Sequence, residues 1–238
     1  MTPGAPGRVA ILGYGPSLDD YVLAARQLGA RRRVADEVWA VNALADVVHV
    51  DRIFHMDDVR IQQVRADAAP ASNIAAMLAW MRTHPGPIYT SRTHPDYPGL
   101  VEYPLAEVLD DLGEPYFNST LAYAVAYAIH IGVDSIMLFG ADFTYANSHQ
   151  AEKGRACVEF WLGVAMARGL EVQVAARSSL MDMAEARPLY GFGALGSRDA
   201  IVGRGEDGRV SVTFAERASL PTAAQIEAAY DHSPRGRP

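Results

Sequence analysis

The sequence predicts an α/β fold with a mostly parallel sheet. Short runs rich in Val, Ile and Leu alternate with longer stretches of helical periodicity, the pattern of parallel strands joined by helices. Half of the 238 residues are hydrophobic and 21% are charged, which is enough for one large core. Near Arg187 the composition shifts towards Gly, Arg and Ser. We therefore expect a single Rossmann-like domain over residues 1–186 and a partly flexible C-terminal extension over residues 187–238.

The first half of the chain shows four strand signals. Residues 9–12 are all apolar, and the run 8–13 is expected to form a buried strand that leads into the glycine-containing turn 13–16 and then a helix. The expected elements are strand 8–13, helix 17–29, strand 37–41, strand 52–55, helix 73–83 with Ser72 as its cap, and strand 86–90.

The second half begins with a stretch that three prolines, at 95, 98 and 104, mark as loop between residues 94 and 105. The strongest helix–strand unit of the chain follows it. The remaining expected elements are helix 118–132, strand 135–139, exit loop 140–145, helix 152–169, strand 171–175, a hairpin around Asp207-Gly208, and helix 221–230 before a frayed tail.

Charge and cysteine content exclude several classes of protein. The 28 acidic and 21 basic residues give a net charge of −7, which argues against a general nucleic-acid coat. The single cysteine excludes an intramolecular disulfide and a cysteine-based zinc site. Because no signal pattern and no membrane-length apolar run occurs, a cytoplasmic protein without membrane contact is expected.

Polar residues follow most of the expected strands. Ligands of open α/β sheets bind beyond the carboxyl ends of the strands, so these residues are expected along one rim. They are Gly13 to Ser17, Asn42, Asp57-Asp58, Thr90 to Arg92, and Gly140 to His149.

The turn Gly13-Tyr14-Gly15-Pro16-Ser17 is the first candidate nucleotide-binding segment. Glycines allow a sharp turn and a close backbone approach, and the amides of a following helix favour a phosphate. The segment lacks the third glycine of the dinucleotide fingerprint, and no Lys-Ser/Thr follows as in a P-loop. An ordinary strand–helix turn is the alternative.

Asparagine side chains provide the next candidates. Asn42 ends a strand, and its amide can both donate to and accept from a base or ribose; a turn-forming role is the alternative. Asn118, Ser119 and Thr120 open a helix, where they can cap it or bind a phosphate or sugar.

Two further clusters carry ionisable groups. His55, Asp57 and Asp58 could hold Mg²⁺ or Mn²⁺, although capping of a helix from Val59 by either aspartate is the simpler interpretation. Arg92 is in a loop that ends at His94, and its guanidinium could bind a phosphate or carboxylate through two hydrogen bonds. The alternative is that this loop is a solvated connector.

The loop after strand 135–139 contains the candidate catalytic residues. Asp142 follows Gly140 in this loop, and His149 comes shortly before the expected helix 152–169. A histidine can act as a general base near neutral pH, whereas a residue at a helix start needs no catalytic role.

These motifs together resemble the bacterial sialyltransferases of glycosyltransferase family 42. The resemblance covers residues 8–176 and rests on Gly13-Tyr-Gly-Pro-Ser-Leu18, Asn42, Ser119-Thr120, Ile136 to Phe143, and a histidine ten residues before Glu159-Phe160. The Gly-Pro-Ser-Leu and Gly-x-Asp motifs are also similar to the archaeal pterin pyrophosphokinase-like (DUF115) group. The overall sequence looks like uncharacterised tailed-phage proteins.

The resemblance implies a glycosyltransferase that moves a sugar from a nucleotide-sugar donor to an acceptor hydroxyl. The nucleotide would lie among Gly13 to Ser17, Asn42, Asn118 to Thr120 and Gly140. His149 would take the acceptor proton, and Asp142 would orient the loop or the ribose. The acceptor would be a small molecule, a glycan or a modified phage DNA base, and a homo-oligomer is possible. No metal or cofactor would be required.

Two alternatives use the same residues differently. A pyrophosphokinase-like enzyme would use ATP and Mg²⁺, with Asp57, Asp58 and Asp142 as the carboxylates. A phage interaction protein would keep the fold without catalysis.

Overall fold

The structure is a computed structural model that describes residues 5–144, 146–183, 189, 191–193 and 195–229. The chain divides into two compact units, Met1–Ala184 and Glu185–Pro238, and each is described here by itself.

A seven-stranded sheet forms the centre of the first unit, and all its strand pairs are parallel. This confirms the expected α/β class and the Rossmann-like parallel sheet. In spatial order the strands are β5 (Leu100–Glu102), β4 (Ile88–Thr90), β3 (Arg52–Phe54), β2 (Glu37–Val41), β1 (Arg8–Leu12), β6 (Ser135–Phe139) and β7 (Glu171–Val174).

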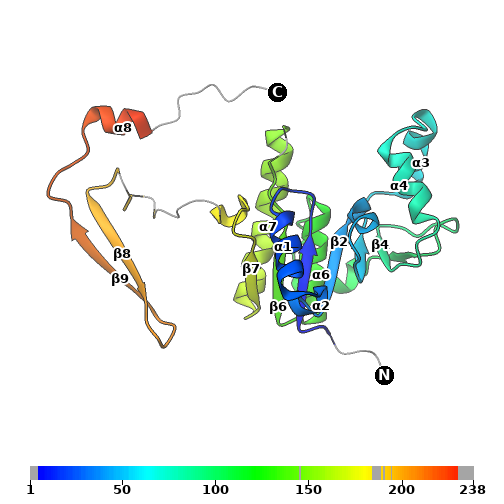
Figure 1. Ribbon diagram of the computed structural model, residues 1–238, viewed down its shortest axis with the longest axis horizontal. Coiled ribbons are helices and arrows are strands. Elements are labelled where there is room, and N and C mark those ends of the chain that lie inside the picture. The colour runs from blue at the N-terminus through cyan, green and yellow to red at the C-terminus, as the bar shows by residue number, and fades with distance from the viewer. Residues whose placement is uncertain (1–4, 145, 184–188, 190, 194, 230–238) are drawn as a thin grey trace. The chain divides into compact units, whose positions relative to one another are not determined.

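Helices cover both faces of this sheet (Figure 1). One face carries α1 (Leu18–Leu28), α2 (Arg31–Val34), α3 (Val59–Ala68) and α4 (Asn73–Met81). The other carries α5 (Leu105–Leu112), α6 (Thr120–Ile131) and α7 (Ser148–Ala167). The 3₁₀ turns η1 (Asn42–Asp46) and η2 (Leu180–Asp182) follow β2 and β7.

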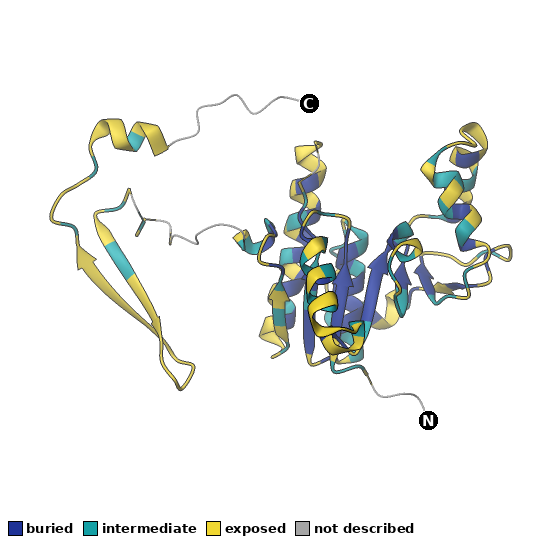
Figure 2. Ribbon diagram, in the orientation of Figure 1, coloured by how far each residue is buried: buried dark blue, intermediate teal, exposed yellow. Residues whose placement is uncertain are grey.

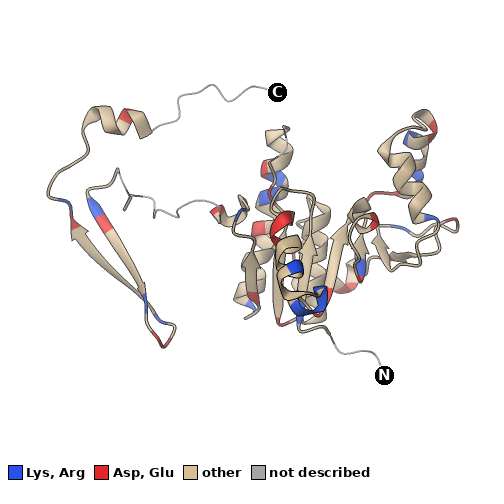
Figure 3. Ribbon diagram, in the orientation of Figure 1, with Lys and Arg blue, Asp and Glu red and all other residues tan. Residues whose placement is uncertain are grey.

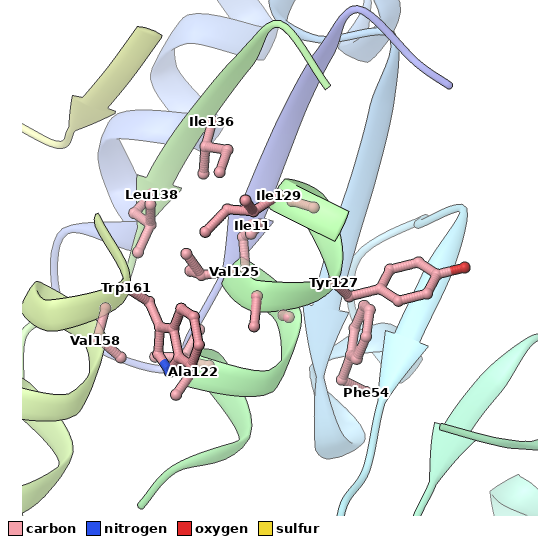
Figure 4. Packing of buried hydrophobic residues seen from close by; sticks show 14 of the residues in the cluster. Ile11, Phe54, Ala122, Val125, Tyr127, Ile129, Ile136, Leu138, Val158 and Trp161 are labelled. Atoms are coloured by element: carbon pink, nitrogen blue, oxygen red, sulfur yellow. The ribbon is translucent and has the colours of Figure 1, made fainter. Parts of the chain in front are cut away.

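Alternation along the strands divides the core between the two faces, as the pleat requires. In β1, Ala10 and Leu12 pack towards α1, whereas Val9 and Ile11 pack towards α6. Figure 4 shows Ile11 with Val125 of α6 and Trp161 of α7 in the hydrophobic cluster on the face that α5, α6 and α7 cover. The central strands β1 and β2 are accordingly mostly buried, while the outer faces of the helices are exposed (Figure 2).

The expected elements of the first unit are found with shifted ends, and the short helix α2, strand β5 and helix α5 were not expected. The stretch 94–105, expected to be mostly loop, contains β5, a three-residue edge strand in which only Leu100 is buried. Helix α5 follows it, and Val108 and Leu112 pack against the core. Both elements are short, so their sequence periodicity is weak.

Helix α7 starts at Ser148, four residues before the expected position. The side chain of Asn147 accepts a hydrogen bond from the Gln150 amide, which caps the helix there. His149, expected in the preceding loop, is therefore in the first turn of α7.

The second unit contains an antiparallel hairpin of β8 (Arg198–Arg204) and β9 (Val210–Glu216), followed by α8 (Ala223–Ala229). The expected hairpin is thus confirmed, with Gly208 at a φ of 78° in its turn. The expected frayed tail and the end of helix 221–230 are outside the described residues.

Candidate functional site

A cavity of about 420 Å³ opens at the carboxyl ends of the central strands. It is located where β1 has β2 on one side and β6 on the other, because the chain adds β2 to β5 on one side of β1 and then returns to add β6 and β7 on the other. Such a switch point is the usual ligand site of open α/β sheets, and the volume is that of a small-molecule site. The cavity is lined by Gly13 to Pro16, Val41, Asn42, Ser119 to Leu121, and Gly140 to Thr144.

The loops after β1 and β6 approach each other most closely at two glycines. A Cβ atom on Gly140 would be 2.2 Å from the carbonyl oxygen of Gly13, and Gly140 also has a φ of 68°. A Cβ atom on Gly13 would be 2.4 Å from the carbonyl oxygen of Gly140. These two glycines are needed for the crossing of the two loops.

Ser17 and Asp142 form a buried pair beneath the cavity. The Ser17 hydroxyl donates to Asp142 Oδ1 at 2.6 Å, and the Ser17 amide donates to Oδ2 at 2.7 Å. The same hydroxyl accepts from the Gly140 amide at 2.8 Å. Ser17 is fully buried and Asp142 is 3% exposed, so Asp142 neutralises the N-terminus of α1 and joins it to the β6 loop.

This pairing bears on the predicted phosphate position at the start of α1. The amides of Gly13, Gly15 and Ser17 already donate to Phe139, Gly140 and Asp142, and Pro16 has no amide hydrogen. A phosphate at the start of α1 would also meet the Asp142 carboxylate, so this end of the cavity is less suited to an anion than the sequence indicates. Gly15 is likewise required by the protein, since a Cβ atom would be 2.3 Å from Asp142 Oδ2.

The N-terminus of α6 presents a different arrangement. Ser119 caps this helix by accepting from the Ala122 amide at 3.3 Å. The amides of Thr120 and Leu121 are in the first turn, where a helix offers them no internal partner, and both residues line the cavity. Ser119, Thr120, Leu121 and the positive end of the helix dipole therefore form part of the cavity wall.

Asn42 and Tyr14 form the opposite wall. Asn42 follows β2 at a φ of 51°, and its Oδ1 atom is 2.9 Å from Nδ1 of the buried His55. The Tyr14 hydroxyl is near the backbone amides of Ala43 and Leu44, and partial burial raises its pKa. Tyr14 therefore connects the β1 loop with η1 across the cavity rim.

Other expected site residues do not line this cavity. Asp58 caps α3 through the Arg60 amide and pairs with the Arg60 guanidinium, the simpler of the two interpretations of that cluster. These bonds lower its pKa to about 2. Asn118 is exposed beside the cavity, and its amide donates to Cys157 Sγ. His149 is exposed, five residues beyond the lining residue Thr144.

Charge is scarce in the cavity. Among the described residues that line it, Asp142 is the sole ionisable acid or base besides the Tyr14 phenol, and its oxygens are held by Ser17. Arginines and acidic residues instead intermix over the outer helices (Figure 3). The described residues contain no group of three or more His, Cys, Asp or Glu side chains suited to a metal ion.

Two lining residues were not expected from the sequence: Val41 and Leu121. Each is adjacent to an expected residue, so the order of motifs along the chain indicated the neighbourhood but not the individual side chains. Phe143 has a φ of 50°, which no feature of the sequence indicated.

The structure is similar to solved sialyltransferases. CstII from Campylobacter jejuni, in complex with the substrate analogue CMP-3FNeuAc, matches 73% of this chain and 82% of its own at 18% identity, with a TM-score of 0.44. CST-II with a trisaccharide acceptor and CMP matches 93% and 98% at 13% identity, with a TM-score of 0.42. The monofunctional alpha-2,3-sialyltransferase Cst-I from Campylobacter jejuni matches 77% and 83% at 14% identity, with a TM-score of 0.40.

These are sialyltransferases, the group that the sequence motifs resemble, and at such identities the likeness concerns the fold alone. No protein-family model and no curated protein sequence matches the chain. Within the described residues, no helix is both long and apolar enough to cross a bilayer.

Proposed function

We propose that the protein is a glycosyltransferase whose nucleotide-sugar donor binds in the cavity between β1, β2 and β6. The observation that carries the proposal is the α6 terminus, where Ser119, Thr120 and Leu121 line the cavity and bring two hydroxyl groups and the first-turn amides of the helix to its wall. This arrangement suits a phosphate, and the Asn42 amide on the opposite wall suits a base or ribose. The donor's phosphate therefore lies against α6 and not against α1.

The charge of the cavity favours a donor with a single phosphate. A di- or triphosphate concentrates negative charge that proteins normally offset with Mg²⁺, Lys or Arg, and the described lining residues include neither Lys nor Arg. A monophosphate leaving group carries less charge, which two amides, hydroxyls and a helix dipole can stabilise. A sugar donor whose leaving group is a nucleoside monophosphate therefore suits this cavity better than ATP does.

In the proposed reaction an acceptor hydroxyl attacks the anomeric carbon of the donor sugar. The new carbon–oxygen bond forms as the bond to the phosphate oxygen breaks, and the nucleoside monophosphate leaves with that electron pair. His149 takes the hydroxyl proton on a ring nitrogen. Asp142 takes no part in proton transfer in this proposal, because it holds α1 against the β6 loop through Ser17.

The acceptor is proposed only as a hydroxyl compound. A glycan, a small molecule and a hydroxylated DNA base all supply that group. The net charge of −7 makes duplex DNA the least suitable of the three, because binding its phosphates requires basic contacts. An origin in a tailed phage and a homo-oligomeric state are predictions from the sequence.

Calorimetric titration tests this function. CMP, UMP, AMP and GMP are titrated in EDTA and again with Mg²⁺, together with CTP. We expect one monophosphate to bind in EDTA, and Mg²⁺ to leave its affinity unchanged. Thr120→Val removes one hydroxyl and should weaken binding about tenfold, whereas Thr93→Val, on an exposed loop, should not. Failure of all four monophosphates to bind, or binding of CTP alone and only with Mg²⁺, would refute the proposal.

A further inference from the structure

The side chains of His55 and Asn42 are neighbours at the carboxyl ends of β3 and β2. Val41 and Phe54 are the last paired residues of the two strands, and Asn42 and His55 come directly after them. His55 Nδ1 is 2.9 Å from Asn42 Oδ1, and His55 is 1% exposed. Asn42 lines the cavity, whereas His55 is not among the lining residues.

This contact fixes which groups can donate. In this contact the amide oxygen of Asn42 faces Nδ1 and can only accept, so in this arrangement the Nδ1 atom of His55 carries the hydrogen. In neutral imidazole the Nε2 atom is then a bare acceptor, and among the described residues it is buried without a partner. A proton on Nε2 would be an unpaired donor in the core, at a higher cost than the unpaired acceptor of a neutral ring.

The amide of Asn42 is therefore oriented by a group beneath it. Its oxygen is committed to His55, so its NH₂ group is left to bind a ligand. The free amide alone would rotate between two nearly equivalent orientations, one presenting donors and the other an acceptor. His55 removes that ambiguity.

We propose that His55 is a positioning residue that holds the Asn42 amide with its two N–H donors available to the cavity, and that the ligand presents a hydrogen-bond acceptor to them. The inference rests on the proposed function in taking a nucleotide as that ligand. It adds that the group bound at Asn42 is a carbonyl oxygen or an unprotonated ring nitrogen of the base, or a ribose oxygen. The His55 side chain itself does not touch the ligand.

A double-mutant cycle on nucleotide affinity tests the coupling, with the monophosphate that binds best to the unmodified protein as probe. His55→Leu removes the donor and should weaken binding about tenfold, the effect of one oriented hydrogen bond. His55→Asn keeps an N–H donor near the Nδ1 position and should stay within about threefold. In the Asn42→Ala background, His55→Leu should have no further effect. An equal loss in both backgrounds would mean that His55 supports the fold only, and would overturn the proposal.

A spectroscopic measurement on the unliganded protein tests the orientation independently of any ligand and of variant folding. Imidazole ¹⁵N shifts distinguish the two neutral tautomers. We expect His55 to carry its proton on Nδ1 and to have a bare Nε2. The opposite tautomer would place the Asn42 NH₂ group towards His55 and its oxygen towards the ligand, which would overturn the inference. If the tautomer is as expected but no monophosphate binds, the proposed function fails while the orientation of the amide stands.

Discussion

Removing the Ser17 hydroxyl is the most informative perturbation of the site's framework. Ser17→Ala eliminates a hydrogen bond to the Asp142 carboxylate and leaves the Gly140 amide without its acceptor, both in a fully buried setting. A hydrogen bond to a charged group contributes about 1.5–3 kcal/mol, and a buried unpaired group costs about 1–3 kcal/mol. We therefore expect a loss of about 3 kcal/mol or more in the free energy of unfolding.

The assay is thermal unfolding followed by calorimetry or circular dichroism. A loss of about 3 kcal/mol corresponds to a fall in Tm of roughly 6–12 °C for a unit of this size. Ser72→Ala is the matched control, because Ser72 caps α4 through one hydrogen bond of 3.3 Å and should cost only about 1 kcal/mol. Equal falls in Tm for the two variants would refute the structural role assigned to the Ser17–Asp142 pair.

Three further predictions follow from named contacts. Gly140→Ala should cost roughly 3 kcal/mol or more by chemical denaturation, because of positive φ and a backbone clash, whereas Gly169→Ala, at a φ of 87° with open space around it, should cost about 1 kcal/mol. Burial lowers the pKa of His55 below 6.5, partly opposed by the charge of Asp57, so the unfolded chain binds the proton first and stability should fall as pH drops below 6.5. His55→Leu should flatten the Tm profile between about pH 6.5 and 5.5, and an unchanged slope would contradict this. His149→Ala should lower turnover about 10²- to 10⁴-fold with nucleotide affinity intact, while His49→Ala, another exposed histidine, should not.

Much of the fold could be predicted because the strands of the first unit carry strong, local signals. The apolar runs of β1 and β6 and the helical periodicity before β6 need no tertiary information. The edge elements β5 and α5 were not predicted, since one buried residue in a three-residue strand leaves too little pattern. The order of the strands in the sheet depends on contacts between residues far apart in the chain, and local sequence patterns do not specify those contacts.

The sequence predicted which segments of the chain meet at the site, but not which residue of each segment does what there. Strand ends placed Gly13, Asn42 and Gly140 together, as the cavity shows. Whether the start of α1 or of α6 offers free amides depends on Asp142, whose carboxylate reaches Ser17 across 125 residues of sequence. The contact between Asn42 and His55 likewise depends on register between two strands, which the sequence alone leaves open.

Backbone amide chemical-shift mapping tests the central claim most directly. CMP, or the monophosphate that binds best, is titrated into ¹⁵N-labelled protein in EDTA. We expect the largest shifts at the amides of Thr120 and Leu121, with a further shift at the Asn42 side-chain NH₂ group and smaller changes at the paired amides of Gly15 and Ser17. Saturable shifts centred on Gly15 and Ser17, with Thr120 and Leu121 unmoved, would contradict the assignment of the phosphate to α6.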